Sequence, residues 1–68
     1  MFWEIEVLRF ATPDGAGPYW RRADRVQAAS MIEAAEKFVQ VHHVGQSPRW
    51  WMDHIFDCGM NRYRITQG

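Results

Sequence analysis

Apolar and polar residues alternate along the first segment of the chain, Phe2–Phe10. Trp3, Ile5 and Val7 share one parity and glutamates stand between them, which is the pattern of a β-strand with one face in a core. The alternation breaks at the end of the segment, which indicates a bulge or a tail packed on both sides. Residues 11–18 are rich in Pro and Gly, so a loop is predicted there.

A second strand is predicted over Tyr19–Ala28, and its alternation is imperfect. Trp20 and Val26 fall on one side with the final alanine, but Arg22 and Asp24 have the same parity. Either these two charged residues pair with each other, or the strand contains a bulge.

One helix is predicted over Met31–His43. Ser30 can accept a hydrogen bond from the amide of Glu33, and the Glu33 carboxylate can reach back to the Ser30 amide, so this pair marks the helix start. Glu33 and Lys37 have the spacing of a favourable i,i+4 ion pair, and Gly45 is the expected C-terminal stop. The apolar positions form one broad arc: Met31, Ile32, Ala34, Ala35, Phe38, Val39 and Val41.

The last segment predicts a hairpin of two strands, Arg49–Asp57 and Met60–Thr66, joined by a two-residue turn at Cys58 and Gly59. The expected facing pairs are Phe56 with Asn61, His54 with Tyr63, and Met52 with Ile65. On the other face Asp53 meets Arg64, an opposite-charge pair that supports this register. A slip of one residue would lose both features.

These elements predict an α+β fold: a single ββαββ domain over residues 1–68, with one helix on one face of a four-stranded antiparallel or mixed sheet. The strand order stays open, because the third strand could lie beside the first or the first could pair in parallel with the fourth. The expected core is Trp3, Ile5, Val7, Trp20, Val26, Met31, Ala35, Phe38, Val39, Met52, Phe56, Tyr63 and Ile65.

Composition narrows the class of protein. The 68 residues are 47% hydrophobic, carry no formal net charge, and include one cysteine, Cys58. A chain this short must be stabilised by its core or by a partner chain, because a disulfide within it is impossible. No signal peptide and no membrane-spanning segment are expected, and the unpaired thiol fits the reducing cytoplasm.

No metal site, cofactor or catalytic residue is predicted. His42 and His43 are neighbours on a helix and point about 100° apart, so they cannot chelate one ion together. His54 and Cys58 are about 13 Å apart along a strand, far beyond zinc–ligand distances. For His42 the favoured interpretation is a last-turn side chain stabilised by the helix dipole, and the alternative is a pH-responsive contact with His54.

The candidate binding residues are Trp51, Arg49, Ile55, Arg62 and Arg64, which the predicted hairpin places together on its outward face. Trp and Arg are the residues most enriched at binding hot spots. Three alternatives remain: a solvated face on which arginine stems cover the indole, a homodimer seam, or a surface that stacks the bases of single-stranded nucleic acid. The zero net charge and the neighbouring acidic residues weigh against nucleic acid.

The segment Val26–Glu36 resembles the strand–cap–helix junction of short phage and bacterial α+β proteins, among them anti-CRISPR and other anti-defence inhibitors. Such proteins bind a large host complex and usually lack catalytic motifs. The resemblance implies a non-enzymatic protein-binding module, a phage-encoded inhibitor that occludes a surface of a host defence complex. It carries over no functional residues, and a small single-stranded nucleic-acid-binding protein is the alternative.

Overall fold

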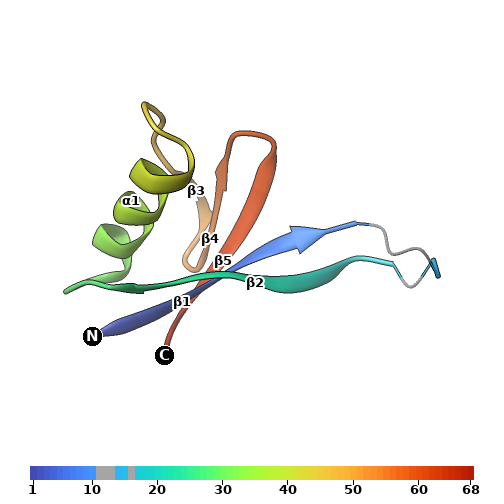
Figure 1. Ribbon diagram of the computed structural model, residues 1–68, viewed down its shortest axis with the longest axis horizontal. Coiled ribbons are helices and arrows are strands. Elements are labelled where there is room, and N and C mark those ends of the chain that lie inside the picture. The colour runs from blue at the N-terminus through green and yellow to red at the C-terminus, as the bar shows by residue number, and fades with distance from the viewer. Residues whose placement is uncertain (11–13, 16) are drawn as a thin grey trace.

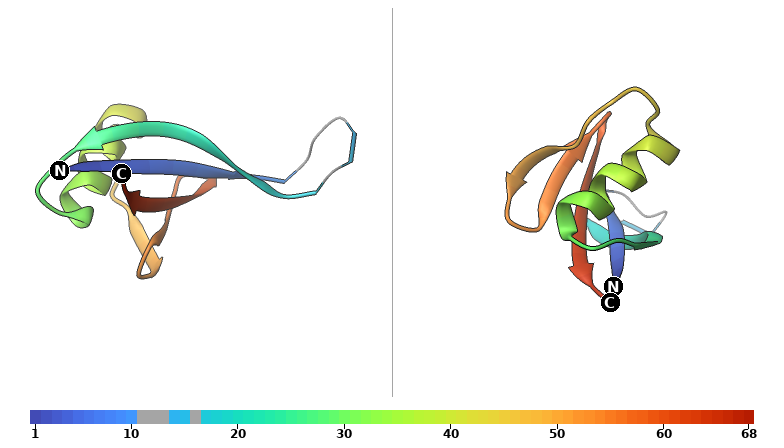
Figure 2. Two further views of the ribbon diagram at one scale, coloured as in Figure 1. Left: turned by 90° about the horizontal axis from the view of Figure 1, so that it is seen from below. Right: turned by 90° about the vertical axis from the view of Figure 1, so that its left-hand side faces the viewer.

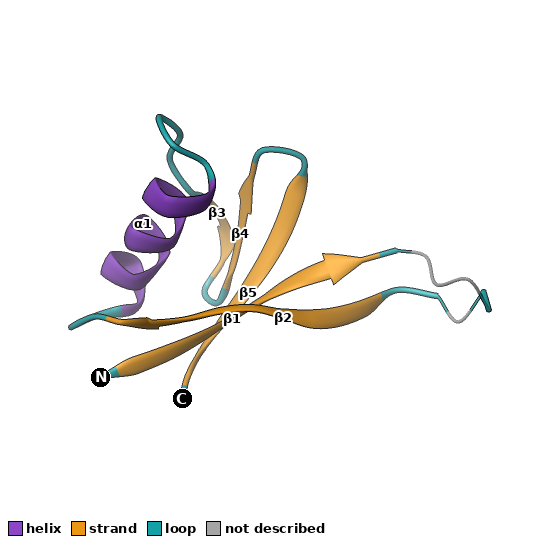
Figure 3. Cartoon of the chain, viewed as in Figure 1, coloured by secondary structure: helices purple, strands orange, loops and turns teal. Residues whose placement is uncertain are grey.

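One antiparallel sheet with a helix on one side forms the framework of the protein (Figures 1 and 3). The computed structural model describes residues 1–10, 14–15 and 17–68. The elements are β1 (Phe2–Arg9), β2 (Tyr19–Gln27), α1 (Met31–His42), β3 (Arg49–Met52), β4 (Ile55–Cys58) and β5 (Asn61–Gln67). The strand order is β2-β1-β5-β4-β3. Part of the predicted loop over 11–18 lies outside the described residues.

The predicted four-stranded ββαββ sheet is wrong, because the sheet has five strands in the order ββαβββ. The predicted strand Arg49–Asp57 folds back on itself at Asp53 and His54, which form a turn between β3 and β4. Aspartate favours turns because its side chain can hydrogen-bond nearby backbone. The pairing of β3 with β4 shifts at Trp51, the residue between two paired positions, and such a bulge bends a strand.

The hairpin of β4 and β5 turns at Gly59 and Met60 instead of Cys58 and Gly59. Gly59 has φ +62°, and glycine in the first position of a two-residue loop is typical of a type II′ turn. Cys58 therefore faces Asn61, and Phe56 faces Tyr63. The predicted facing pairs of Phe56 with Asn61, His54 with Tyr63, and Met52 with Ile65 are therefore wrong. Within β4 and β5 the register differs from the predicted one by two residues, so the side chains of these two strands keep their expected faces.

The imperfect alternation of the second strand is explained by a bulge. Ile5 pairs with Asp24 and Glu6 pairs with Arg22, so Ala23 is the extra residue. Of the two sequence interpretations, the bulge is confirmed. Its consequence is that the residues before Ala23 change face relative to those after it.

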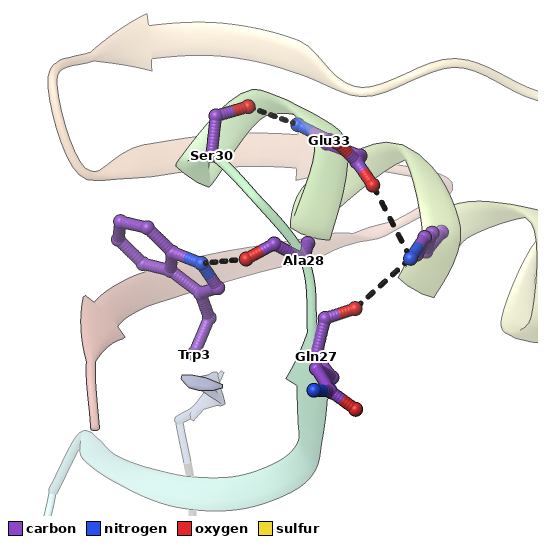
Figure 4. Close-up of polar contacts among 6 residues, drawn as sticks. Trp3, Gln27, Ala28, Ser30 and Glu33 are labelled. Atoms are coloured by element: carbon purple, nitrogen blue, oxygen red, sulfur yellow. Dashed lines mark hydrogen bonds and ion pairs between the residues drawn. The ribbon is translucent and has the colours of Figure 1, made fainter. Parts of the chain in front are cut away.

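The helix begins where the sequence predicts. The Glu33 amide donates to Ser30 Oγ at 3.2 Å, while the Glu33 carboxylate pairs with Lys37 Nζ at 3.2 Å instead of reaching back to the Ser30 amide. Lys37 Nζ also donates to the carbonyl oxygen of Gln27, 3.0 Å away, and so ties α1 to the end of β2 (Figure 4). The helix ends at His42, and Gly45, with φ +84°, serves the following turn.

The core lies between α1 and the sheet (Figure 2). Its buried residues are Ile5, Val7, Ala28, Ala34, Ala35, Phe38, Val39, Phe56, Cys58, Tyr63 and Ile65. Trp3 packs at its edge and donates from Nε1 to the Ala28 carbonyl at 3.2 Å (Figure 4). Two predicted core residues are wrong: Trp20 lies on the other face because of the bulge, and Met52 is 49% exposed beside the new turn.

Candidate binding face

Every second residue of each strand points away from α1, onto a side that no other helix or strand of the described chain covers. We call this side the open face. Its charged and aromatic residues are Phe2, Glu4, Glu6, Trp20, Arg22, Arg25, Arg49, Trp51, Asp57, Arg62 and Arg64. Five arginines face three carboxylates there, so the open face carries an excess of two positive charges.

The residues of the open face form three groups, in each of which an arginine joins an aromatic ring to a carboxylate. In the first group the Arg62 guanidinium lies 4.4 Å from the centre of the Trp51 ring. Its Nε and Nη2 donate to the two oxygens of Asp57 at 2.8 and 3.1 Å. This bidentate pair fixes the guanidinium plane over the indole.

The second group joins Trp20, Arg64 and Glu6. The Arg64 guanidinium lies 4.6 Å from the Trp20 ring centre, and its Nη2 donates to Glu6 at 2.7 Å. Arg64 was expected to pair with Asp53, and that prediction is wrong, because Asp53 lies in the turn between β3 and β4. Glu6 stands directly opposite Arg64 in the pairing of β1 with β5.

The third group lies at the end of the β1–β2 hairpin that is opposite its connecting loop. The Arg25 guanidinium lies 4.3 Å from the centre of the Phe2 ring and 3.3 Å from Glu4. Arg22 pairs with the other oxygen of the same carboxylate at 3.1 Å. Exposed ion pairs such as these contribute about 0–1 kcal/mol each, so their main effect is to hold the side chains in place.

All five residues singled out from the sequence lie on the open face. Trp51 is 57% exposed, Arg49 stands opposite Asp57, and half-buried Ile55 stands opposite Arg64. The stacking of Arg62 on Trp51, one of the alternatives weighed from the sequence, is present. That this face binds a partner stays a prediction.

Sequence reasoning missed the contribution of β1 and β2 to this face. Trp20, Arg22 and Arg25 belong to it because the bulge at Ala23 sets their orientation. The signal was present in the broken alternation of the second strand, but the sequence does not say which residue is extra.

In the first group, the surroundings of Asp57 favour its ionised form. The hydrogen bonds from Arg62 hold the pKa of Asp57 below its usual range, with a smaller coulombic contribution from Arg62 and Arg49 that burial partly opposes. Asp57 is therefore ionised at neutral pH, and the guanidinium stays oriented over Trp51.

An apolar groove borders the open face at β3, between this strand and the start of α1. It has a volume of about 370 Å³. Its lining residues are Met31, Ile32, Trp50, Trp51, Met52 and Asp53. Ile32 is 57% exposed and Met52 is 49% exposed, so the apolar surface around Trp51 continues around the edge of the sheet.

The histidines and the cysteine take part in separate contacts. His43 Nε2 and the Tyr63 hydroxyl lie 2.6 Å apart, and Asn61 Nδ2 donates to the same hydroxyl at 3.2 Å. Burial raises the pKa of Tyr63 and also that of the Cys58 thiol. Within the described ranges, no three His, Cys, Asp or Glu side chains cluster as metal ligands would.

His42 lies over Phe38, with ring centres 4.4 Å apart, and its Nε2 is 3.1 Å from Asp24 Oδ2. It therefore ties the end of α1 to β2. His54 stands in the turn between β3 and β4, and no contact between the two histidines is present among the described residues.

Comparisons of the chain with protein-family models, with curated proteins and with solved structures give no match. Among the residues that the structure describes, no helix has the length and apolar character needed to span a membrane.

Proposed function

We propose that this protein is a non-enzymatic binding protein whose open face, centred on Trp51, docks onto an acidic surface of a protein partner. The observation that carries the proposal is the group of Trp51, Arg62 and Asp57. An exposed indole is held against a guanidinium whose other side is fixed by a bidentate carboxylate. Such a group is ordered before binding, so less side-chain entropy is lost when a partner docks.

Charge supports the choice of an acidic protein surface. The open face has two more arginines than carboxylates, and Arg49 has no ion pair among the described residues. A partner that presents carboxylates to Arg49 and an apolar side chain to the groove beside Trp51 would complement both parts of the surface. Complementary charge of this kind speeds association and excludes wrong partners.

Nucleic acid fits the open face less well. Arg22, Arg25, Arg62 and Arg64 are already paired with carboxylates. A phosphate that approached these arginines would have to displace or face the same carboxylates, which repel it. We therefore treat single-stranded nucleic acid as an alternative outcome of the test below.

Inhibition is the activity proposed for the docked protein. A chain of 68 residues that binds a larger assembly can block the surface it covers without any chemistry of its own. The resemblance of Val26–Glu36 to the strand–cap–helix junction of phage anti-defence proteins supports an inhibitor of a host defence complex, of the anti-CRISPR type.

The test begins with affinity capture from the source host and mass spectrometry, followed by measured dissociation constants for the captured protein. Trp51→Ala should weaken binding by at least about 2 kcal/mol, the hot-spot threshold. The matched control is Val41→Ala, since Val41 is 71% exposed on the helix, outside the open face and the groove. Arg49→Glu should also weaken binding, because it reverses a charge facing the acidic partner.

Salt separates the two classes of partner. Phosphate-led binding should fall by orders of magnitude between about 50 and 200 mM salt, whereas a protein interface anchored by Trp51 should weaken far less. If Trp51→Ala and Arg49→Glu both fold and bind like the control, the open face is not the binding site. Self-association that Trp51→Ala abolishes would show that the partner is a second copy of the chain.

A further inference from the structure

The side of the sheet that faces the helix carries a second polar surface, which the proposed function does not use. Beyond the end of α1, a hollow of about 380 Å³ lies between the last helical turn and the hairpin of β1 and β2. Its lining residues are Val7, Arg9, Arg21, Arg22, Ala23, Phe38, His42 and Tyr63. Two of these arginines, Arg9 and Arg21, belong to the side of the sheet that faces α1.

Strand geometry explains why two of these arginines meet. Ile5, Val7 and Arg9 share the helix side of β1. Val7 is paired with Arg21, so Arg21 lies on the same side, diagonal to Arg9. The bulge at Ala23 sets this orientation, and bulges in known proteins often aim a side chain at a functional site.

The charges of these two arginines are not compensated by the rest of the described chain. Arg9 and Arg21 make no ion pair among the described residues, whereas Arg22 is paired with Glu4 on the open face. His42, which also lines the hollow, pairs with Asp24 at 3.1 Å. Two arginines without an ion pair among the described residues therefore line one concave surface.

We propose that this hollow binds a phosphate group in its dianionic form, through Arg9 and Arg21. Two uncompensated guanidiniums match a charge of about −1.5 to −2, which a phosphate monoester carries at neutral pH. Each planar guanidinium can present two N–H donors to a pair of phosphate oxygens. A carboxylate, with one charge and two oxygens, would leave one arginine unmatched.

The hollow also has room for more than the phosphoryl group itself. Phe38 and Tyr63 form part of its wall, so an organic group attached to the phosphate would meet an aromatic surface. The phosphate could be a free ion or part of a monoester of a larger molecule. The two arginines would bind either one through its charge, but only the monoester would also contact this aromatic wall.

The experiment titrates the full chain at about pH 7.5, where the monoester is dianionic, with inorganic phosphate and with O-phosphoserine. Arginine Nε–Hε signals in heteronuclear NMR are the readout. Saturable shifts of the Arg9 and Arg21 signals, with a dissociation constant of about 1 mM or lower, would support the site. Tighter binding of O-phosphoserine identifies a monoester as the ligand, and equal binding identifies the free ion.

Variants and a second anion complete the test. Arg9→Gln and Arg21→Gln should each weaken phosphate binding by about tenfold, the factor for a loss of about 1.4 kcal/mol. Lys37→Gln, which removes the same charge outside the hollow, should leave it unchanged. Acetate at matched ionic strength should produce no saturable shift.

Two results would overturn the proposal. Cations near a helix C-terminus are stabilising by themselves. One result is that phosphate produces no saturable shift while Arg9→Gln and Arg21→Gln lower the melting temperature. In that case the two arginines stabilise the C-terminal end of α1 and do not bind a ligand. If a short oligothymidylate binds more tightly than either monoester and depends on the same arginines, the ligand is a phosphodiester backbone instead.

Discussion

Replacing Phe38 by alanine removes the side chain that joins the helix to the sheet. Phe38 is 2% exposed, and its ring centre lies 4.9 Å from that of Tyr63 and 6.4 Å from that of Phe56, both in edge-on geometry. A buried Phe→Ala change costs about 3–5 kcal/mol. A domain of this length has about 3–10 kcal/mol of stability in total, so this variant is expected to lose at least about a third of it.

Urea denaturation followed by tryptophan fluorescence, with helix content followed by circular dichroism, measures the loss. Phe38→Leu keeps most of the volume and should fold, with a cost of about 1–2 kcal/mol. Val41→Ala is the control on the same helix and should change stability by about 0.5 kcal/mol or less. A midpoint for Phe38→Ala equal to that of the control would refute the packing of α1 described above.

The remaining predictions concern two turn glycines, Gly45 after α1 and Gly59 between β4 and β5, and the ion pair of Arg62 with Asp57. Gly45→Ala and Gly59→Ala should each cost about 1–2 kcal/mol in thermal melts, because both glycines have positive φ. Gly59→Ala should cost more, since its Cβ would stand 3.2 Å from the His43 ring while that of Gly45 meets open space; equal losses would contradict this. The hydrogen bonds from Arg62 lower the folded-state pKa of Asp57 below its usual value. This carboxylate therefore stabilises the fold above its unfolded pKa, and that contribution is lost as pH falls through the lower folded pKa. Urea midpoints measured from about pH 5 to 2 should therefore fall less steeply for Asp57→Asn than for the unmodified chain, and identical slopes would show that the pair adds nothing to stability.

The parts of the fold that the sequence predicted are those fixed by neighbours along the chain. The start of α1 follows from Ser30 and Glu33 within one turn, and its buried side follows from the helical period. The faces of β4 and β5 were correct even though their register was not, since a shift of two residues preserves the alternation.

The errors arise where a side chain's position depends on another strand. The alternation of Arg49–Asp57 runs on without Gly or Pro, so nothing local marked the turn at Asp53 and His54. Cys58 was expected at a hairpin tip and is buried, because the glycine beside it takes the first turn position. The residues of the open face could be named from the last hairpin alone, but their partners Glu6 and Trp20 come from strands whose placement depends on sheet order.

The central position of β1 and β5 has a consequence for how the protein folds during synthesis. These two strands come from opposite ends of the sequence, so Arg64 meets Glu6 across 58 positions, and the Gly68 amide donates to Phe2 at 2.9 Å beside the N-terminus (Figure 1). Contacts between such distant segments make folding slow, because a long loop must close first. Until β5 leaves the ribosome, one edge of β1 has no partner and Ile5 is uncovered, which is a state prone to aggregation. The pairing of β5 with β1 is therefore the step that covers Ile5 and ends this exposure.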